Sequence, residues 1–176
     1  MKKKNSIVQQ RKKVKFDNKH LNDPKIKKVY LAFKKQLYSQ IKNEKFCIGV
    51  SGGPDSLALA FLSKIFSKKF SSKFVALIID HNLRKQSGIE ARKVKKILTK
   101  HKIKAKILTW KGKIPKSNIQ FNARNIRYFL LKKECSKLNI KNLVLAHHEG
   151  DLIENFFIRL FRGSGLKGLS SLNIKR

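Results

Sequence analysis

The chain has 176 residues, 41% of them hydrophobic, which is enough for one ordinary domain with a real core and excludes a disordered tail. Its 43 Lys and Arg against 10 Asp and Glu leave a formal net charge of +33, which favours a polyanionic partner, nucleic acid above all. Because Lys outnumbers Arg by 35 to 8, compositional drift toward Lys remains a second explanation for part of the charge.

The cysteines and the apolar runs argue against several classes of protein. Cys47 and Cys135 lie far apart in the sequence with no CxxC spacing, so neither a disulfide framework nor a zinc site is indicated. No apolar run approaches the roughly 20 residues of a membrane span, and no signal-type apolar stretch follows the lysines at the amino end. We therefore expect a cytoplasmic protein with no membrane partner.

The amino end separates into a basic arm and a helix. Residues 1–23 are basic and lack periodicity, which predicts a flexible arm that either contacts RNA phosphates or is simply solvated. From Pro24, which suits the first turn of a helix, apolar residues recur at helical spacing up to Ile41. This pattern predicts a leading helix at about 25–43, at the start of a domain over 24–176.

Short apolar runs then alternate with longer helical patterns. Four runs have the length and β-branched content of buried strands: 46–50, 74–80, 105–110 and 142–147. Helical patterns follow them at about 56–69, 87–102, 120–138 and 151–162. This alternation predicts an α/β fold, a parallel sheet with helices on both faces, whose ligands bind at the carboxyl ends of the strands.

A bend of small residues follows the first predicted strand. It consists of Ser51, Gly52, Gly53, Pro54, Asp55 and Ser56. The two glycines let the backbone approach a ligand, and the helix that begins near Asp55 or Ser56 points its free N–H groups at the bend. With the serine hydroxyls, this predicts a nest for phosphate or pyrophosphate. The bend is neither a Walker A loop nor GxGxxG, and a turn capped by Ser or Asp is the purely structural alternative.

Polar side chains also follow the second predicted strand. Asp80 and His81 fall at its carboxyl end, level with the phosphate nest if the two strands are neighbours. Asp80 could accept a hydrogen bond from a nucleoside, and Arg84 could bind phosphate. Each of these residues is equally suited to an ordinary turn.

The fourth predicted strand ends in "AHHEGDLIENFFIRLFRGSG". His148 and Asp151 could reach one metal ion, but no third ligand has zinc spacing, so a zinc site is disfavoured. Asp151 and Glu154 have the spacing of a capping box, which is compatible with a helix that begins inside the site.

Arginines gather around these strand ends in a chain that otherwise uses lysine. Arg124 and Arg127 share a helical face with Tyr128, a combination that suits phosphate or base contact, although a solvated basic face is the alternative. We expect five of the eight arginines to bind RNA through the planar fork of guanidinium: Arg84, Arg124, Arg127, Arg159 and Arg162.

Taken together, the strand ends resemble a known family. "SGGPDS" is similar to the SGGxDS pyrophosphate loop of the N-type ATP pyrophosphatase (PP-loop) superfamily. "IIDHNLR", "NIQFNARNIRY" and "AHHEGDLIENFFIRLFRGSGLKGL", in that order, resemble the tRNA(Ile)-lysidine synthetase family, and the likeness covers about 26–169. It implies a Rossmann-like sheet of the adenine nucleotide alpha hydrolase-like kind.

The reaction that this resemblance implies is an ATP-dependent ligation. ATP adenylates the C2 oxygen of the wobble cytidine in tRNA(Ile) with a CAU anticodon and releases pyrophosphate. Free L-lysine then displaces AMP to form lysidine. ATP and Mg²⁺ are thus the implied cofactors, and a pyrophosphate cradle on a basic surface is what such chemistry needs.

The resemblance also implies roles for matching residues. Nucleotide binding falls to the bend Ser51, Gly52, Gly53, Pro54, Asp55 and Ser56, and to Asp80 and His81. Catalysis falls to Asp55, His148, Asp151 and Glu154, with Asp55 and Asp151 as Mg²⁺ ligands.

The chain departs from the family in two respects. Gly150 stands where members carry the first of two adjacent acids, a gap that Glu149 could fill, and Asn155 replaces a Thr. The family's catalytic domain also continues past the Gly-Ser-Gly segment, and most members carry further tRNA-binding domains. We therefore expect the domain at 24–176 to be incomplete at its carboxyl end, as a fragment or a truncated product.

Other functions stay open at this point. tRNA thiolation enzymes share the SGGxDS loop but tend to use paired cysteines, and GMP and NAD synthetases share it without needing this charge. A nonenzymatic RNA-binding protein and a truncated, inactive chain are the alternatives from other classes. A homodimer is also compatible with the sequence.

Overall fold

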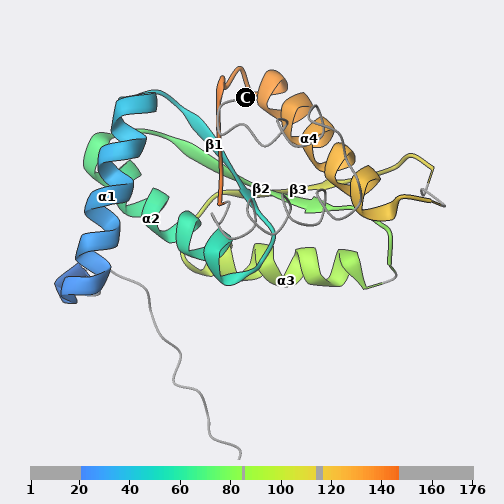
Figure 1. Ribbon diagram of the computed structural model, residues 1–176, viewed down its shortest axis with the longest axis horizontal. Coiled ribbons are helices and arrows are strands. Elements are labelled where there is room, and N and C mark those ends of the chain that lie inside the picture. The colour runs from blue at the N-terminus through green and yellow to red at the C-terminus, as the bar shows by residue number, and fades with distance from the viewer. Residues whose placement is uncertain (1–20, 85, 114–116, 147–176) are drawn as a thin grey trace, which may run out of the picture.

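Helices and strands alternate through residues 21–84, 86–113 and 117–146, the part of the chain that the computed structural model describes (Figure 1). In chain order the elements are α1 (Pro24–Ile41), β1 (Phe46–Val50), α2 (Pro54–Phe70), β2 (Phe74–Asp80), α3 (Ser87–Lys100), β3 (Ala105–Thr109), α4 (Ile119–Lys137) and β4 (Asn142–Leu145). The helix expected at 151–162 and residues 1–20 of the basic arm lie outside the described residues.

The predicted elements that fall in the described residues are confirmed, with ends that differ by about two residues at most. Asp23, assigned to the arm from the sequence, caps α1 instead, because its side chain accepts hydrogen bonds from the backbone N–H of Lys25 at 2.8 Å and of Ile26 at 3.4 Å. The second helix begins at Pro54 rather than at Asp55 or Ser56. Proline lacks an N–H, so it fits the first helical position, where that donor has no intrahelical acceptor.

The four strands form one sheet in the order β3-β2-β1-β4. All three pairings are parallel, and the register aligns Val50 with Ile78 and Asp80 with Thr109. The carboxyl ends of the strands therefore meet at one edge. The central strand β1 lies between β2 and β4, so the bend that follows β1 emerges in the middle of that edge.

Helices cover both faces of the sheet, as the alternation predicts (Figure 1). On one face Ile48 and Ile78 pack with residues of α2 and α3, including Leu98. On the other face Cys47 and Leu77, one position earlier in each strand, pack beneath α4. Alternate strand residues point to opposite faces, so each strand contributes to two separate apolar clusters.

The two cysteines, far apart in the sequence, come together beneath α4. Cys47 on β1 and Cys135 on α4 are both buried and share a side-chain hydrogen bond. Burial, followed by the neighbouring Cys135, raises the pKa of Cys47 to about 12. Both groups are therefore neutral thiols at neutral pH and belong to the core.

Candidate functional site

The bend between β1 and α2 depends on a backbone conformation that favours glycine. Gly52 has a φ of +96°, and a Cβ placed on it would come within 2.6 Å of the Val94 Cγ2 atom of α3. Only glycine tolerates both the dihedral angle and this close approach. Helix α3 therefore packs directly against the bend.

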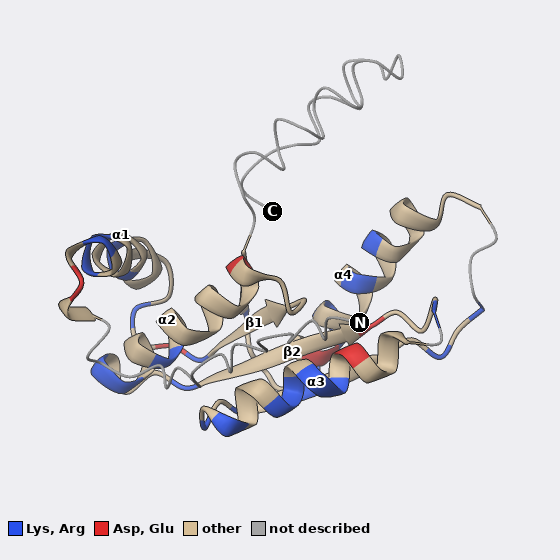
Figure 2. Ribbon diagram, turned by 90° about the horizontal axis from the view of Figure 1, so that it is seen from below, with Lys and Arg blue, Asp and Glu red and all other residues tan. Residues whose placement is uncertain are grey.

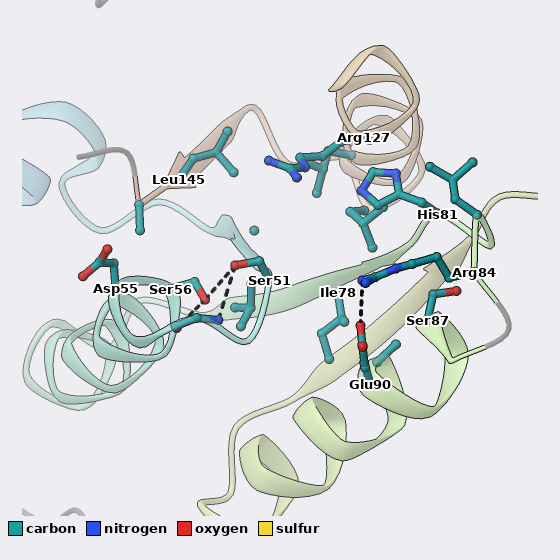
Figure 3. Close-up of a pocket in the computed structure, with 18 residues that line it drawn as sticks. Ser51, Asp55, Ser56, Ile78, His81, Arg84, Ser87, Glu90, Arg127 and Leu145 are labelled. Carbon is teal, nitrogen blue, oxygen red and sulfur yellow. Dashed lines mark hydrogen bonds and ion pairs between the residues drawn. The ribbon is translucent and has the colours of Figure 1, made fainter. Parts of the chain in front are cut away.

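Two serine hydroxyls fix the shape of this bend (Figure 3). The Ser56 side chain, only 6% exposed, accepts hydrogen bonds from the Gly52 N–H at 3.1 Å and from the Ser51 hydroxyl at 3.2 Å. It donates in turn to the Gly53 carbonyl at 2.9 Å. The amide of Gly52 is therefore satisfied inside the bend, and the bend is rigid before any ligand binds.

The amino end of α2 is left open for an anion. Its N-cap residue is Gly53, and no side chain caps the helix, so the alternative of a turn capped by Ser or Asp is wrong. The exposed amide groups of the first turn and the positive end of the helix dipole face the carboxyl edge of the sheet. An uncapped helix start beside a glycine bend is a phosphate-binding arrangement.

A cavity of about 450 Å³ opens at this edge of the sheet. Its walls come from the bend, the end of β2, the first turn of α3, the middle of α4 and the end of β4 (Figure 3). The polar lining residues are Ser51, Asp55, Ser56, His81, Arg84, Ser87, Glu90 and Arg127. Apolar side chains such as Ile78 and Leu145 form the rest, a mixture suited to a ligand with a flat apolar part and a charged part.

His81 and Arg127 lie close together on the wall of this cavity (Figure 3). Burial lowers the pKa of His81, the Arg127 guanidinium lowers it further, and Asp80 acts in the opposite direction. The His81 Nδ1 atom is buried and has no hydrogen-bond partner among the described residues. The imidazole is thus neutral at neutral pH, and within the described part of the chain its Nδ1 atom is unpaired inside the wall of the cavity.

Arg84, in the turn after β2, and Glu90, in the first turn of α3, form an ion pair at 3.3 Å. Their side chains are 75% and 53% exposed, so the pair adds little to stability and is easily opened by a competing ligand. Glu90 was not among the residues predicted from the sequence. The signal was available, because an acid in the first turn of a helix that follows a strand end lies at the ligand edge.

Asp80 is turned away from the cavity. Its carboxylate is 7% exposed, and its Oδ1 atom accepts hydrogen bonds from the Asn82 N–H at 3.0 Å and from the Ser87 hydroxyl at 2.7 Å. These bonds close the turn that leads from β2 into α3. The nucleoside contact expected of Asp80 stays a prediction, and the described geometry gives this residue a role in positioning the cavity wall.

A family model for the PP-loop domain matches residues 25–176. The chain belongs to the PP-loop domain family. Membership of this family supports the use of ATP.

Curated relatives of this PP-loop domain carry one name. The chain is 47% identical over 133 residues to a protein of Orientia tsutsugamushi (strain Boryong) named tRNA(Ile)-lysidine synthase. This match covers 76% of this chain and 30% of that protein. It is 40% identical over 149 residues to a Rickettsia rickettsii (strain Sheila Smith) protein of the same name, covering 83% of this chain and 31% of that protein. The chain therefore spans about a third of the length of these relatives.

A solved structure shares the fold of this PP-loop domain. The U34-tRNA thiolase NcsA from Methanococcus maripaludis, described with its [4Fe-4S] cluster, superposes with a TM-score of 0.65 at 19% sequence identity. The match covers 80% of this chain and 53% of that protein. The Rossmann-like architecture expected from the sequence is thereby confirmed.

The structure brings together part of the predicted site of the PP-loop domain. Asp55, His81, Arg84 and Arg127 line one cavity with the bend, whereas Arg124 is not among the lining residues and lies over the Tyr128 ring at 5.7 Å. The remaining predicted residues lie outside the described part: His148, Asp151, Glu154, Arg159 and Arg162.

The described residues bear on the expected Mg²⁺ site and on the expected absence of a membrane-spanning helix. Within 21–84, 86–113 and 117–146, no group of three or more His, Cys, Asp or Glu side chains could hold a metal ion. Asp55, one of the two predicted Mg²⁺ ligands, is exposed beside the bend, and the other, Asp151, is outside these ranges. No helix in the same ranges is long and apolar enough to cross a membrane.

Proposed function

We propose that this PP-loop domain is the ATP-binding part of a tRNA(Ile)-lysidine synthase. The observation that carries the proposal is the cavity at the carboxyl edge of the sheet, where a rigid glycine bend and an uncapped helix meet two arginines and a neutral histidine. The names of the curated relatives supply the substrate class, tRNA(Ile). The cavity by itself supports nucleotide binding. The reaction proposed for it follows from the similarity to the named relatives.

In this proposal the triphosphate of ATP lies against the bend. The first-turn amides of α2 donate hydrogen bonds to the phosphate oxygens, while Arg84 and Arg127 approach from the other walls. The apolar lining around Ile78 receives the flat base. Because the bend is already held by the Ser56 hydroxyl, little ordering is needed when ATP binds.

The reaction begins with attack of the wobble cytidine on the α-phosphate. The C2 oxygen of that cytidine forms a bond to phosphorus as the bond to the leaving pyrophosphate breaks, and the donors of the bend stabilise the charge that builds on pyrophosphate. The ε-amine of free L-lysine then attacks C2, and AMP leaves. The product is lysidine, a cytidine with lysine joined through nitrogen.

Acidic side chains at the cavity suit the two cationic participants, Mg²⁺ and the ammonium group of lysine. Asp55 and Glu90 both line the cavity, and carboxylate oxygens are the ligands that Mg²⁺ takes. Asp55 with Asp151 would hold the ion, which when bound would neutralise phosphate charge. We assign Glu154 and His148 to the same centre on the strength of the family resemblance.

Pyrophosphate release tests the proposal. The chain is mixed with ATP, Mg²⁺, lysine and tRNA(Ile) transcript, and release is followed while each component is omitted in turn. We expect ATP binding by the chain, a single round of pyrophosphate release that requires tRNA(Ile) with a CAU anticodon, and repeated turnover that requires lysine as well. ATP turnover that is independent of lysine would contradict the ligation, and RNA binding without ATP binding would reduce the chain to a nonenzymatic RNA-binding protein.

The thiolation alternative is disfavoured by the state of the cysteines. A sulfur-transfer site needs accessible thiolates, but the only two cysteines of the chain are buried and the pKa of Cys47 is raised to about 12. Neither cysteine is among the residues that line the cavity. Lysine-dependent ligation therefore fits these residues better than sulfur transfer does.

A further inference from the structure

An exposed aromatic surface lies at the outer edge of the sheet, beyond β3. Trp110 follows β3 directly, and its ring meets that of Phe129 on α4 edge to face, with 6.2 Å between centroids. Phe129 is 54% exposed, and Phe121, about two turns earlier on α4, is 65% exposed. We call Trp110, Phe121 and Phe129 the aromatic surface. Trp110 is half-buried, whereas the two phenylalanines are more than half exposed, and exposed apolar side chains gathered in this way mark an interaction site.

Trp110 is held in place by its own loop. Its backbone N–H donates to the Asp80 carbonyl at 2.9 Å, and its indole N–H donates to the Lys113 carbonyl at 3.2 Å. The next residue but one, Gly112, packs against the ring so closely that a Cβ there would overlap it. The indole is thus fixed before a partner arrives, which lowers the entropy lost on binding.

The surroundings of the aromatic surface are strongly basic. Residues 105–113 and 117–138 contain eight Lys or Arg and a single acid, Glu134. That acid is buried and bonded to Lys106 at 2.6 Å, so it offers no negative charge to a partner. Lys133 lies over the Phe129 ring at 5.9 Å. Figure 2 shows Lys and Arg on α4 as well as on α3.

We propose that the aromatic surface binds unpaired nucleotides of RNA by stacking their bases on Trp110 and Phe129, while the surrounding cations bind the phosphates. Rings interleaved with cations are the arrangement that single-stranded nucleic acid requires, and duplex RNA hides the base faces that such rings contact. An ordinary protein partner would have to be highly acidic to approach this region. The proposal rests on the proposed function, and it names the part of the tRNA that is held: a loop with splayed bases.

The aromatic surface is linked to the ATP cavity through two elements. The Asp80 carbonyl that fixes Trp110 precedes His81, which lines the cavity. On α4, Arg127 lines the cavity and Phe129 follows two residues later on the exposed side. A loop that stacks on the aromatic surface can therefore reach toward the cavity across the middle of α4.

The test uses Trp110 as a built-in probe, because it is the only tryptophan of the chain. Its fluorescence is followed while the whole chain is titrated with a tRNA anticodon stem-loop, with a blunt-ended RNA duplex of equal charge, and with inorganic polyphosphate. Binding is measured in parallel by the anisotropy of labelled RNA, and ATP binding by equilibrium dialysis. We expect the stem-loop to quench Trp110 and the other two polyanions to leave its emission unchanged.

Two variants and a matched control separate stacking from charge. Phe129→Ala should weaken stem-loop binding by about tenfold, as expected for one lost stacking contact, and Phe121→Ala tests the same surface without altering the packing of Trp110. Tyr38→Ala is the control, since Tyr38 is a 43% exposed aromatic on α1 whose ring packs on Phe70. It should change neither RNA binding nor quenching, and ATP binding should be unchanged in all three.

Each other outcome is decisive. Stem-loop binding without quenching, and unchanged in both α4 variants, overturns the aromatic surface but leaves the proposed function standing. Equal quenching by polyphosphate or by the RNA duplex would show that the binding is a charge effect and would overturn the stacking proposal. If acrylamide fails to quench Trp110 in the free chain, another part of the protein covers the aromatic surface, and the proposal is overturned. ATP binding with no RNA binding at all overturns the tRNA part of the proposed function as well.

Discussion

Gly52 of the PP-loop and Val94 of α3 approach so closely that a Cβ on Gly52 would lie 2.6 Å from Val94 Cγ2. The loop that is proposed to hold phosphate therefore rests on a helix more than forty residues away in the chain. This contact has no room for a methyl group, and the φ of +96° at Gly52 disfavours any other residue independently.

Gly52→Ala is expected to destabilise the fold by about 1–3 kcal/mol and to abolish ATP binding, because the loop must shift. Gly53→Ala is the matched control for the loss of stability, since Gly53 lies in the same bend but itself lines the cavity. Gly53 has a φ of −69°, and a Cβ there would meet nothing closer than Ser51 Oγ at 3.7 Å. Thermal unfolding and ATP dialysis measure both variants, and equal effects of the two substitutions would show that space at Val94 is unimportant.

Ser56→Ala should cost about 1–3 kcal/mol of stability, because it strands the Gly52 N–H that the Ser56 hydroxyl accepts. The loop should also lose rigidity, so the affinity for ATP should fall. Ser63→Ala is the control on the same helix, since the Ser63 hydroxyl is fully buried without a hydrogen-bond partner among the described residues. Denaturant unfolding should find Ser63→Ala neutral or stabilising, and a loss as large as that of Ser56→Ala would contradict this account.

Arg127→Lys is expected to weaken ATP binding by about tenfold, because an ammonium group cannot reproduce the two parallel hydrogen bonds of a guanidinium group with phosphate. Arg124→Lys, one turn earlier and outside the cavity lining, should leave ATP affinity unchanged. The comparison is made by equilibrium dialysis at fixed salt. Unchanged affinity in Arg127→Lys would mean that Lys serves equally well at this position.

His81 should make the protein less stable in mild acid. In the unfolded chain its pKa returns to about 6.5, whereas burial and Arg127 lower the pKa in the folded state. Between the two values the unfolded chain binds more protons, so the free energy of unfolding falls as pH drops below about 6.5 and levels off below the folded pKa.

The His81→Gln variant should lose this part of the pH dependence, and Arg127→Gln should raise the pKa of His81. Burial also lowers the pKa of His101, which contributes with the same sign, so the difference between the parent chain and His81→Gln isolates His81. Urea unfolding between pH 5 and 8 and histidine NMR titration provide the readouts. Identical pH profiles for the two chains would refute the assignment.

The cysteines should resist alkylation in the folded protein. Cys47 and Cys135 are buried, and the raised pKa of Cys47, about 12, leaves almost no thiolate at pH 8. Iodoacetamide should therefore modify neither residue until denaturant is added, after which both should react rapidly. Mass spectrometry counts the modified thiols, and rapid modification of the native chain would reopen the thiolation alternative.

Local patterns in the sequence were sufficient to predict the element types and the place of the site. The β-branched runs at 46–50 and 74–80 are too short for helices and too apolar for loops, so their assignment follows from composition alone. The glycines after the first run permit a backbone that other residues rarely adopt, and Gly52 uses this freedom. Because parallel strands bring their carboxyl ends together, the residues after each strand had to meet if the strands paired.

Side-chain direction could not be predicted in the same way. Asp80 follows a strand at the ligand edge, yet its carboxylate is directed into its own turn by Asn82 and Ser87. Glu90 enters the cavity only because α3 begins where it does and Arg84 reaches back to it. Such directions depend on hydrogen-bond partners supplied by the folded backbone.

The sequence by itself therefore determined an α/β PP-loop domain with a basic surface and an anion-binding bend after its first strand. Only the tertiary structure decided that β1 lies between β2 and β4, that Val94 closes on Gly52, and that Cys47 meets Cys135 in the core. The physical reason is the distance along the chain over which each effect acts. Propensity and spacing act over a few residues, whereas these contacts join residues that are brought together only when distant elements pack.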